Sequence, residues 1–175
     1  PITTPQVSRW FHKHIYGKNS HIKSPSIATK QLFGTQILVA EDNNVNQLVI
    51  RSMLESLGAN IYIVENGEDA VNHYREYHSL YDLILMDCEM PVMDGYDAAI
   101  EIHKTAKQLE LDSPIIIALS AHVLAVHREK AKKSGMQDFI SKPVMRGKLA
   151  TCLERNLPKK DWNGFVHPNL RKQDS

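Results

Sequence analysis

Apolar runs and segments of helical period alternate five times along this chain, and this alternation is the feature that most restricts its fold. The apolar runs are 36–40, 60–64, 82–86, 114–119 and 138–141. The helical segments between and after them are Asn44–Leu57, Glu68–Tyr77, Tyr96–Leu109, Leu124–Ser134 and Gly147–Leu157. The first, third and fourth runs are almost wholly apolar, as in strands covered by helices on both faces. We therefore predict a doubly wound α/β domain whose five-stranded parallel sheet has the order 2-1-3-4-5.

Charge divides the chain into three parts. Residues 1–34 carry five bases and no acid, and residues 158–175 carry four bases and two acids. Because the whole chain of 175 residues carries only +1, the acidic middle carries −6. We expect a basic linker or leader over 1–34, the α/β domain over 35–157 and a C-terminal extension over 158–175. The 42% hydrophobic content argues against general disorder.

The N-terminal sequence and the two cysteines give indications of the cellular compartment. There is no apolar run of the roughly 20 residues that a membrane span needs, and no N-terminal signal pattern. Cys88 and Cys152 form no CxxC pair, which favours a reducing, cytoplasmic setting. The chain starts without Met, so we interpret it as a piece of a longer polypeptide, with the cytoplasmic part of an inner-membrane sensor as one possibility.

Charged and polar residues follow the predicted strands at the points where they end. Glu41 and Asp42 follow the first strand, Asp87 the third, Ser120 the fourth and Lys142 the fifth. In doubly wound sheets the carboxyl ends of the strands meet at one edge, where ligands bind. We therefore predict that three carboxylates, one hydroxyl and one ammonium converge there.

This set of side chains suits a magnesium-assisted phosphoryl transfer. Three neighbouring carboxylates repel one another unless a cation neutralises them, and Mg²⁺ prefers oxygen ligands. Asp42 and Asp87 are the candidate direct ligands, with Glu41 acting through a water. Lys142 and Ser120 can bind phosphoryl oxygens, and Asp87, at the centre of the sheet, can act as the nucleophile that forms an aspartyl phosphate.

The motifs ILVAEDNNVNQ, LILMDCEMPVMDG, ALSA and DFISKPV occur in order, and with them residues 36–157 resemble the receiver domain of two-component response regulators. The resemblance implies a flavodoxin-like three-layer sandwich. It also implies that Asp87 is the phosphoacceptor, that Glu41 and Asp42 are the acidic Mg²⁺ pair, and that the backbone carbonyl of Glu89 is a further metal ligand. Ser120 would be the switch hydroxyl and Lys142 the phosphoryl-binding lysine, followed by a cis bond to Pro143.

Two positions depart from the common family pattern. Glu41 stands where Asp is commoner, and Phe139 stands where many relatives carry the Tyr that swings inward on activation. Phe139 has no hydroxyl, so any switch at this ring must rest on packing alone. The resemblance otherwise implies a segment that catalyses its own phosphorylation and dephosphorylation.

The motifs are most similar to those of receiver domains that are fused to hybrid sensor histidine kinases. This similarity implies that the parent chain is a protein-histidine kinase. A stand-alone single-domain regulator that binds a target protein is the alternative. An aspartate-nucleophile phosphohydrolase and an FMN protein fit poorly, since the first wants DxD and the second would meet repulsion from Glu41 and Asp42.

The partners expected are a histidine kinase core, a histidine-phosphotransfer domain, or both, without nucleic acid and without membrane contact by this segment. On the predicted first helix, Ile50, Met53, Leu54 and Leu57 form one apolar face. Val45 and Leu48 widen that face, either as cover for the rim of the core or as an exposed docking patch. We interpret the mixed basic and aromatic stretch 9–18 as a linker or a short docking helix rather than a nucleic-acid site. The loose spacing of His12, His14 and His21 argues against a metal site there.

Overall fold

The computed structural model describes residues 32–122 and 124–157. The predictions for 1–31, including His12, His14 and His21, and for 158–175 lie outside this part of the chain. The strands are β1 (Gln36–Ala40), β2 (Asn60–Val64), β3 (Leu83–Asp87), β4 (Ile116–Ser120) and β5 (Asp138–Ser141). The helices are α2 (Asn44–Ser56), α3 (Gly67–Tyr77), η1 (His78–Leu80), α4 (Gly95–Gln108), α5 (Ala125–Lys133) and α6 (Arg146–Asn156).

The five strands form one parallel sheet in the order β2-β1-β3-β4-β5, which confirms the predicted topology. The central strands β3 and β4 are buried along their whole length, whereas β2 and β5 at the two edges are only partly buried. Burial on both faces is the reason that the central strands are almost continuously apolar in sequence.

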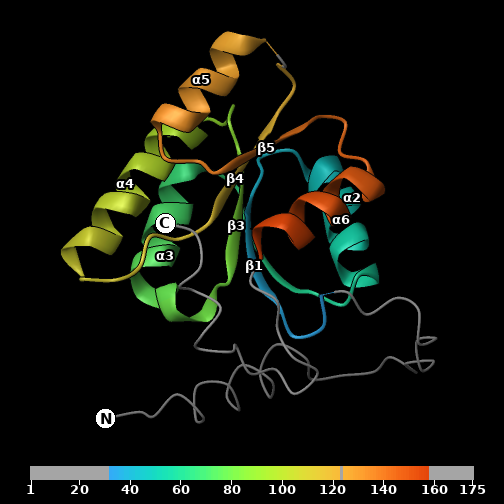
Figure 1. The fold of residues 1–175 in the computed structure, drawn as a ribbon, viewed down its shortest axis with the longest axis horizontal. Helices are drawn as coiled ribbons and strands as arrows, with labels where there is room; N and C mark the ends of the chain where they lie inside the picture. The colour runs from blue at the N-terminus through green and yellow to red at the C-terminus, as the bar shows by residue number, and fades with distance from the viewer. Residues whose placement is uncertain (1–31, 123, 158–175) are drawn as a thin grey trace.

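Helices cover both faces of the sheet and make three layers (Figure 1). On one face, α2 and α6 pack through Ile50, Leu54, Leu149 and Leu153, as the predicted apolar face of the first helix requires. Leu32, before β1, also packs into this core. On the other face, α3, α4 and α5 pack over the sheet, with Tyr74, Ile102 and Ala131 among their buried contacts.

Two strands end one residue later than predicted. β3 runs to Asp87 and β4 to Ser120, so these polar residues are the last residues of their strands rather than the first residues of the loops. The parallel register pairs Asp87 with Leu119, which carries the ladder past the last apolar residue of β3. Hydrophobic periodicity marks burial and therefore misses a polar residue that is still held in the sheet.

A close approach of backbone fixes the start of α4 just beyond β3. A Cβ atom at Gly95 would lie 2.0 Å from the backbone oxygen of Asp87, so only glycine fits. The Gly95 N–H donates to the Cys88 carbonyl at 3.2 Å, and Asp94 caps the helix by accepting from the Asp97 N–H. This packing holds the segment that follows Asp87 against the sheet.

Candidate functional site

The carboxyl edge of the sheet brings together the residues that the strand ends predicted. Oxygen atoms of Glu41, Asp42 and Asp87 all lie within 4.8 Å of one another. Glu41 and Asp87 are buried, whereas Asp42 is exposed to solvent. Lys142, from the segment after β5, joins this cluster from the opposite side of β3.

Lys142 bridges two of the three carboxylates. Its Nζ donates to Asp87 Oδ2 at 2.6 Å and lies 2.7 Å from Glu41 Oε2. Burial would lower the pKa of Lys142, but the hydrogen bonds and charges of Asp87 and Glu41 outweigh burial and raise it. These contacts therefore favour the charged form of Lys142. The peptide bond from Lys142 to Pro143 is cis, as the family resemblance implied.

The surroundings of Asp87 act on the pKa of its carboxyl group in opposite directions. Burial raises the pKa of its carboxyl group, while hydrogen bonds from Lys142 and from the Glu89 N–H, together with the Lys142 charge, act in the opposite direction. The Glu89 N–H donates to Asp87 Oδ1 at 3.1 Å. One carboxylate oxygen thus faces the ammonium and the other faces the loop after β3, which positions the group rigidly.

Glu41 is held by amide groups that the sequence interpretation did not single out. Asn46 Nδ2 donates to Glu41 Oε1 at 2.9 Å, the Asn43 N–H donates to the same atom at 3.3 Å, and Gln47 Nε2 donates to the Glu41 carbonyl at 2.7 Å. Asn43 also caps α2. The motif EDNNVNQ contains all of these residues, so its closely spaced Asn and Gln residues could have predicted the hydrogen bonds to Glu41. The amides fix the longer side chain of Glu41 at the site.

The oxygen set fits a hard divalent cation. Glu41 Oε2 is buried and pairs with the Lys142 ammonium at 2.7 Å. Asp42 offers an exposed carboxylate next to Asp87. A buried acceptor with a free lone pair beside two further carboxylates is the donor chemistry that Mg²⁺ binds, directly or through water.

Ser120 is at the edge of the site but makes its hydrogen bonds to the loop that follows β4. Its Oγ accepts from the His122 N–H at 3.0 Å and contacts the His122 carbonyl at 3.3 Å. The His122 ring in turn lies 2.7 Å, through Nδ1, from Glu89 Oε1. The loops after β3 and β4 are therefore joined by one exposed contact between an imidazole and a carboxylate.

Phe139 lies on β5, two strands away from Asp87 in the sheet. In the parallel register it pairs with Ala118, whereas Ser120 pairs with Ser141. Its ring is partly buried against the core that α3, α4 and α5 cover, and the Arg128 guanidinium of α5 lies 5.1 Å from the ring centroid. The structure does not bring Phe139 into contact with the acidic cluster.

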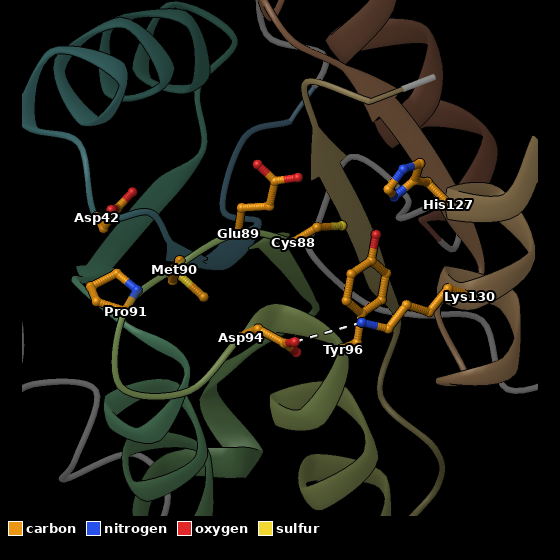
Figure 2. Close-up of a pocket in the computed structure, with 9 residues that line it drawn as sticks. All are labelled: Asp42, Cys88, Glu89, Met90, Pro91, Asp94, Tyr96, His127 and Lys130. Atoms are coloured by element: carbon orange, nitrogen blue, oxygen red, sulfur yellow. Dashed lines mark ion pairs between the residues drawn. The ribbon is translucent and has the colours of Figure 1, made fainter. Parts of the chain in front are cut away.

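A cleft of about 390 Å³ opens beside the acidic cluster, between the loop after β3 and helix α5 (Figure 2). Asp94 and Lys130 form an ion pair across it at 3.6 Å, and the Lys130 ammonium lies 3.9 Å from the centroid of the Tyr96 ring. Cys88, also at this cleft, is buried, and burial raises the pKa of its thiol to about 11. Burial and the raised pKa both disfavour the reactive thiolate form of Cys88.

The order of the strands, with an acidic cluster and a facing lysine at their carboxyl ends, is that of the receiver fold. The chemotaxis protein CheY4 of Vibrio cholerae has a similar fold and matches 70% of the chain, with a TM-score of 0.62 at 20% identity. Residues 37–154 match the family model of the response regulator receiver domain, and the chain belongs to this family. It is therefore a phosphorelay receiver domain of two-component signalling.

Two further relatives show the context in which similar domains occur. The sensor protein GacS of Pseudomonas syringae pv. syringae is 36% identical over 134 residues, which are 77% of this chain but only 14% of that protein. The receiver domain of the sensor histidine kinase PA1611 from Pseudomonas aeruginosa, solved with a magnesium ion in its active-site cleft, is 41% identical and covers 70% of this chain and 97% of that one, with a TM-score of 0.61. The chain thus spans a small fraction of its curated relatives, which include hybrid histidine kinases.

No helix in the described part of the chain is long and apolar enough to cross a membrane.

Proposed function

We propose that residues 35–157 are the phosphoacceptor module of a hybrid sensor histidine kinase and that Asp87 receives the phosphoryl group from a phosphohistidine. Residues 1–34 would then be the linker to the kinase core and 158–175 an extension. The observation that carries this proposal is the Lys142 ammonium shared between Asp87 and Glu41 at 2.6 and 2.7 Å. The kinases among the curated relatives favour a hybrid kinase over a stand-alone regulator.

The transfer makes one bond and breaks one. An Asp87 carboxylate oxygen attacks phosphorus, the phosphorus–nitrogen bond of the donor breaks, and its electron pair stays on the imidazole nitrogen. The hydrogen bond and positive charge of Lys142 favour the ionised form of Asp87, although burial raises its pKa, and the ammonium can afterwards follow the new negative charge on the phosphoryl oxygens. Ser120 would donate a hydrogen bond from its hydroxyl to one of those oxygens once that hydroxyl leaves the His122 backbone.

The acidic residues would hold the metal. Asp42, Asp87 and the Glu89 backbone carbonyl are the proposed direct ligands, and Glu41 acts through a water. Bound Mg²⁺ would supply positive charge that screens the carboxylates and the phosphoryl oxygens from one another. The amides of Asn43, Asn46 and Gln47 hold Glu41 in place for this task.

The partner surface proposed for transfer is the exposed apolar patch on α2. Val45 and Leu48 are both 67% exposed, and Val49 is 42% exposed. The patch begins three residues after Asp42, so a helix docked on it would bring a histidine to the acidic edge. A structure of the histidine phosphotransfer protein Ypd1 with the receiver domain of Ssk1 from Saccharomyces cerevisiae, 31% identical, covers 70% of this chain and 92% of that one at a TM-score of 0.64. This complex supports a histidine-phosphotransfer domain as the partner. The kinase's own helices are the other proposed partner, and we propose that the interaction takes place in the cytoplasm.

The test is a mass measurement on the full chain with a phosphohistidine donor, with Mg²⁺ or with EDTA. We expect a base-labile gain of one phosphoryl group only with Mg²⁺, and its loss in Asp87→Asn. Asp97→Asn, on the exposed first turn of α4, is the matched control and should be labelled like the wild type. Labelling of Asp87→Asn at the wild-type level would refute the assignment.

A further inference from the structure

The outer edge of the sheet carries a second cleft that phosphoryl transfer does not use. It measures about 400 Å³ and lies between β2 and α3. Within the sheet formed by the described residues, β2 pairs only with β1, so the backbone groups along its outer side have no strand partner. The residues that line this β2–α3 cleft are Tyr62, Ile63, Val64, Glu65, Asp69, Asn72, His73 and Glu76.

The β2–α3 cleft is acidic. Glu65, Asp69 and Glu76 line it, and none of the three forms an ion pair with a cation of the described part of the chain. Burial lowers the pKa of His73, although the Glu76 charge acts to raise it, so this imidazole is largely neutral at pH 7. Three carboxylates therefore face the cleft without a compensating charge.

The cleft also offers a flat aromatic surface. The Tyr62 ring stacks on the His73 imidazole with centroids 4.0 Å apart and planes inclined by 9°. Tyr62 is 37% exposed and lies on the edge strand. A guanidinium or ammonium over such a ring gains about 0.5–1 kcal/mol at an exposed site, beyond its attraction to nearby carboxylates. The chemistry of the cleft therefore fits an extended segment rich in Lys and Arg.

A basic segment without acidic residues is joined to the domain. Residues 1–31 contain Arg9, Lys13, Lys18, Lys23 and Lys30 and no acidic residue. The chain enters the described part at Leu32, whose N–H donates to the Leu57 carbonyl at 3.0 Å, four residues before β1. β2 is the neighbour of β1 and is only about 17 Å long, whereas even ten extended residues reach about 33 Å.

We propose that the basic segment 1–31 of this same chain docks in the β2–α3 cleft, with its Lys and Arg side chains on Glu65, Asp69 and Glu76. The tether gives the segment an effective concentration in the millimolar range, so weak contacts suffice. The docked segment would cover the open sheet edge, which otherwise invites association with other chains. This inference does not depend on the phosphorylation of Asp87.

Paramagnetic NMR on the full chain tests the proposal. A nitroxide is attached to Ser24→Cys, one residue after Lys23. The native cysteines should not react, because they are 1% and 5% exposed and burial raises their thiol pKa values to about 11 and about 12. We expect loss of amide intensity over residues 62–76 at low salt and its recovery at about 1 M salt, where the Debye length is about 3 Å.

Charge reversal supplies the matched variants. Glu65→Lys with Glu76→Lys should abolish the intensity loss, whereas Glu129→Lys with Glu154→Lys, on α5 and α6, should leave it unchanged. An intensity loss centred elsewhere, none at all, or one that survives Glu65→Lys with Glu76→Lys would overturn the proposal. A mixed sample adds a further check, in which one chain carries the nitroxide without isotope label and the other carries the isotope label without nitroxide. Intensity loss in the isotope-labelled chain would also overturn the proposal, because a second copy would then supply the segment.

Discussion

The Lys142 ammonium donates a 2.6 Å hydrogen bond to Asp87 Oδ2 across a separation of 55 residues. The same ammonium lies 2.7 Å from Glu41 Oε2, so one cation serves two buried carboxylates. Without it, two negative charges would share a site from which water is largely excluded. Lys142 therefore has a structural role in the unphosphorylated domain, where it neutralises two carboxylates. It is also the candidate phosphoryl-binding residue.

Lys142→Ala should therefore destabilise the domain in the absence of metal. Removing one partner of a buried ion pair leaves the other uncompensated, and we expect the free energy of unfolding at pH 7 to fall by about 3 kcal/mol. Urea unfolding in EDTA measures the change, and Lys148→Ala, on an exposed part of α6, is the control. An unchanged unfolding free energy in Lys142→Ala would mean that the carboxylates are neutralised in another way.

Asp42→Asn should weaken metal binding without disturbing the fold, because Asp42 is exposed and its carboxylate contributes charge rather than packing. Loss of one of about three ligand charges should raise the Mg²⁺ concentration for half-maximal phosphorylation by about tenfold or more. A Mg²⁺ titration of the mass gain measures this. Glu154→Gln, on α6, provides the control, and an Mg²⁺ requirement that is the same in Asp42→Asn and wild type would exclude Asp42 as a ligand.

Leu48→Asp should impair transfer between proteins but not labelling by a small phosphodonor. The side chain is 67% exposed, so a carboxylate there costs the fold little, while it places a charge in the proposed docking patch. Transfer rates from a phosphorylated histidine-phosphotransfer domain, compared with labelling by acetyl phosphate, measure the difference. Leu109→Asp, at the far end of α4, is the matched control. Equal transfer rates in Leu48→Asp and wild type would place the docking surface elsewhere.

Beryllofluoride with Mg²⁺ should shift the amide signals of Ser120 and Phe139 as well as those beside Asp87. A phosphoryl mimic on Asp87 attracts the Ser120 hydroxyl away from the His122 loop, and Phe139 can then turn inward over the vacated space. We expect shifts over α5, β5 and α6, and none in Asp87→Asn. Shifts that stay within the residues adjoining Asp87 would show that no signal passes from the site to Phe139.

Asp138→Asn should lower stability in a pH-dependent way. Burial opposes ionisation of Asp138, but hydrogen bonds from Arg155, Asn156, the Phe139 N–H and Cys152 outweigh it and lower the pKa to about 2. Because the folded-state pKa lies below the unfolded one, the stabilisation is complete above about pH 5 and is lost as the pH falls from about 4 to about 2. Since Arg155 is largely exposed, we expect only about 1 kcal/mol at pH 7.

Urea unfolding of wild type and Asp138→Asn between pH 7 and pH 2 measures this contribution. The two unfolding free energies should differ at pH 7 and converge toward pH 2. Asp97→Asn, in the exposed first turn of α4, provides a comparison in which the convergence should be smaller. A difference that stays constant down to pH 2 would show that Asp138 does not act through its charge.

The fold could be predicted because its signals are local. Apolar runs such as 36–40 mark strands buried on both faces, and intervening segments such as 44–57 carry a helical period. The alternation of the two permits few arrangements of a parallel sheet. The same topology rule placed Asp42, Asp87 and Lys142 at one edge, because parallel strands all end there. The order of the strands and the meeting of these residues at one edge therefore followed from the amino-acid sequence alone.

Only the tertiary structure decided how these residues meet. Three features were not predicted: the Lys142 bridge, the amides around Glu41 and the hydrogen bonds that converge on Asp138. They depend on contacts between segments that are remote in sequence, or on rotamers that packing sets. Whether Val45 and Leu48 cover the core or face solvent was likewise open, because a wide apolar arc is compatible with both. Periodicity reports which side of a helix is buried, but the width of the buried strip is set by the neighbours that the fold places against it.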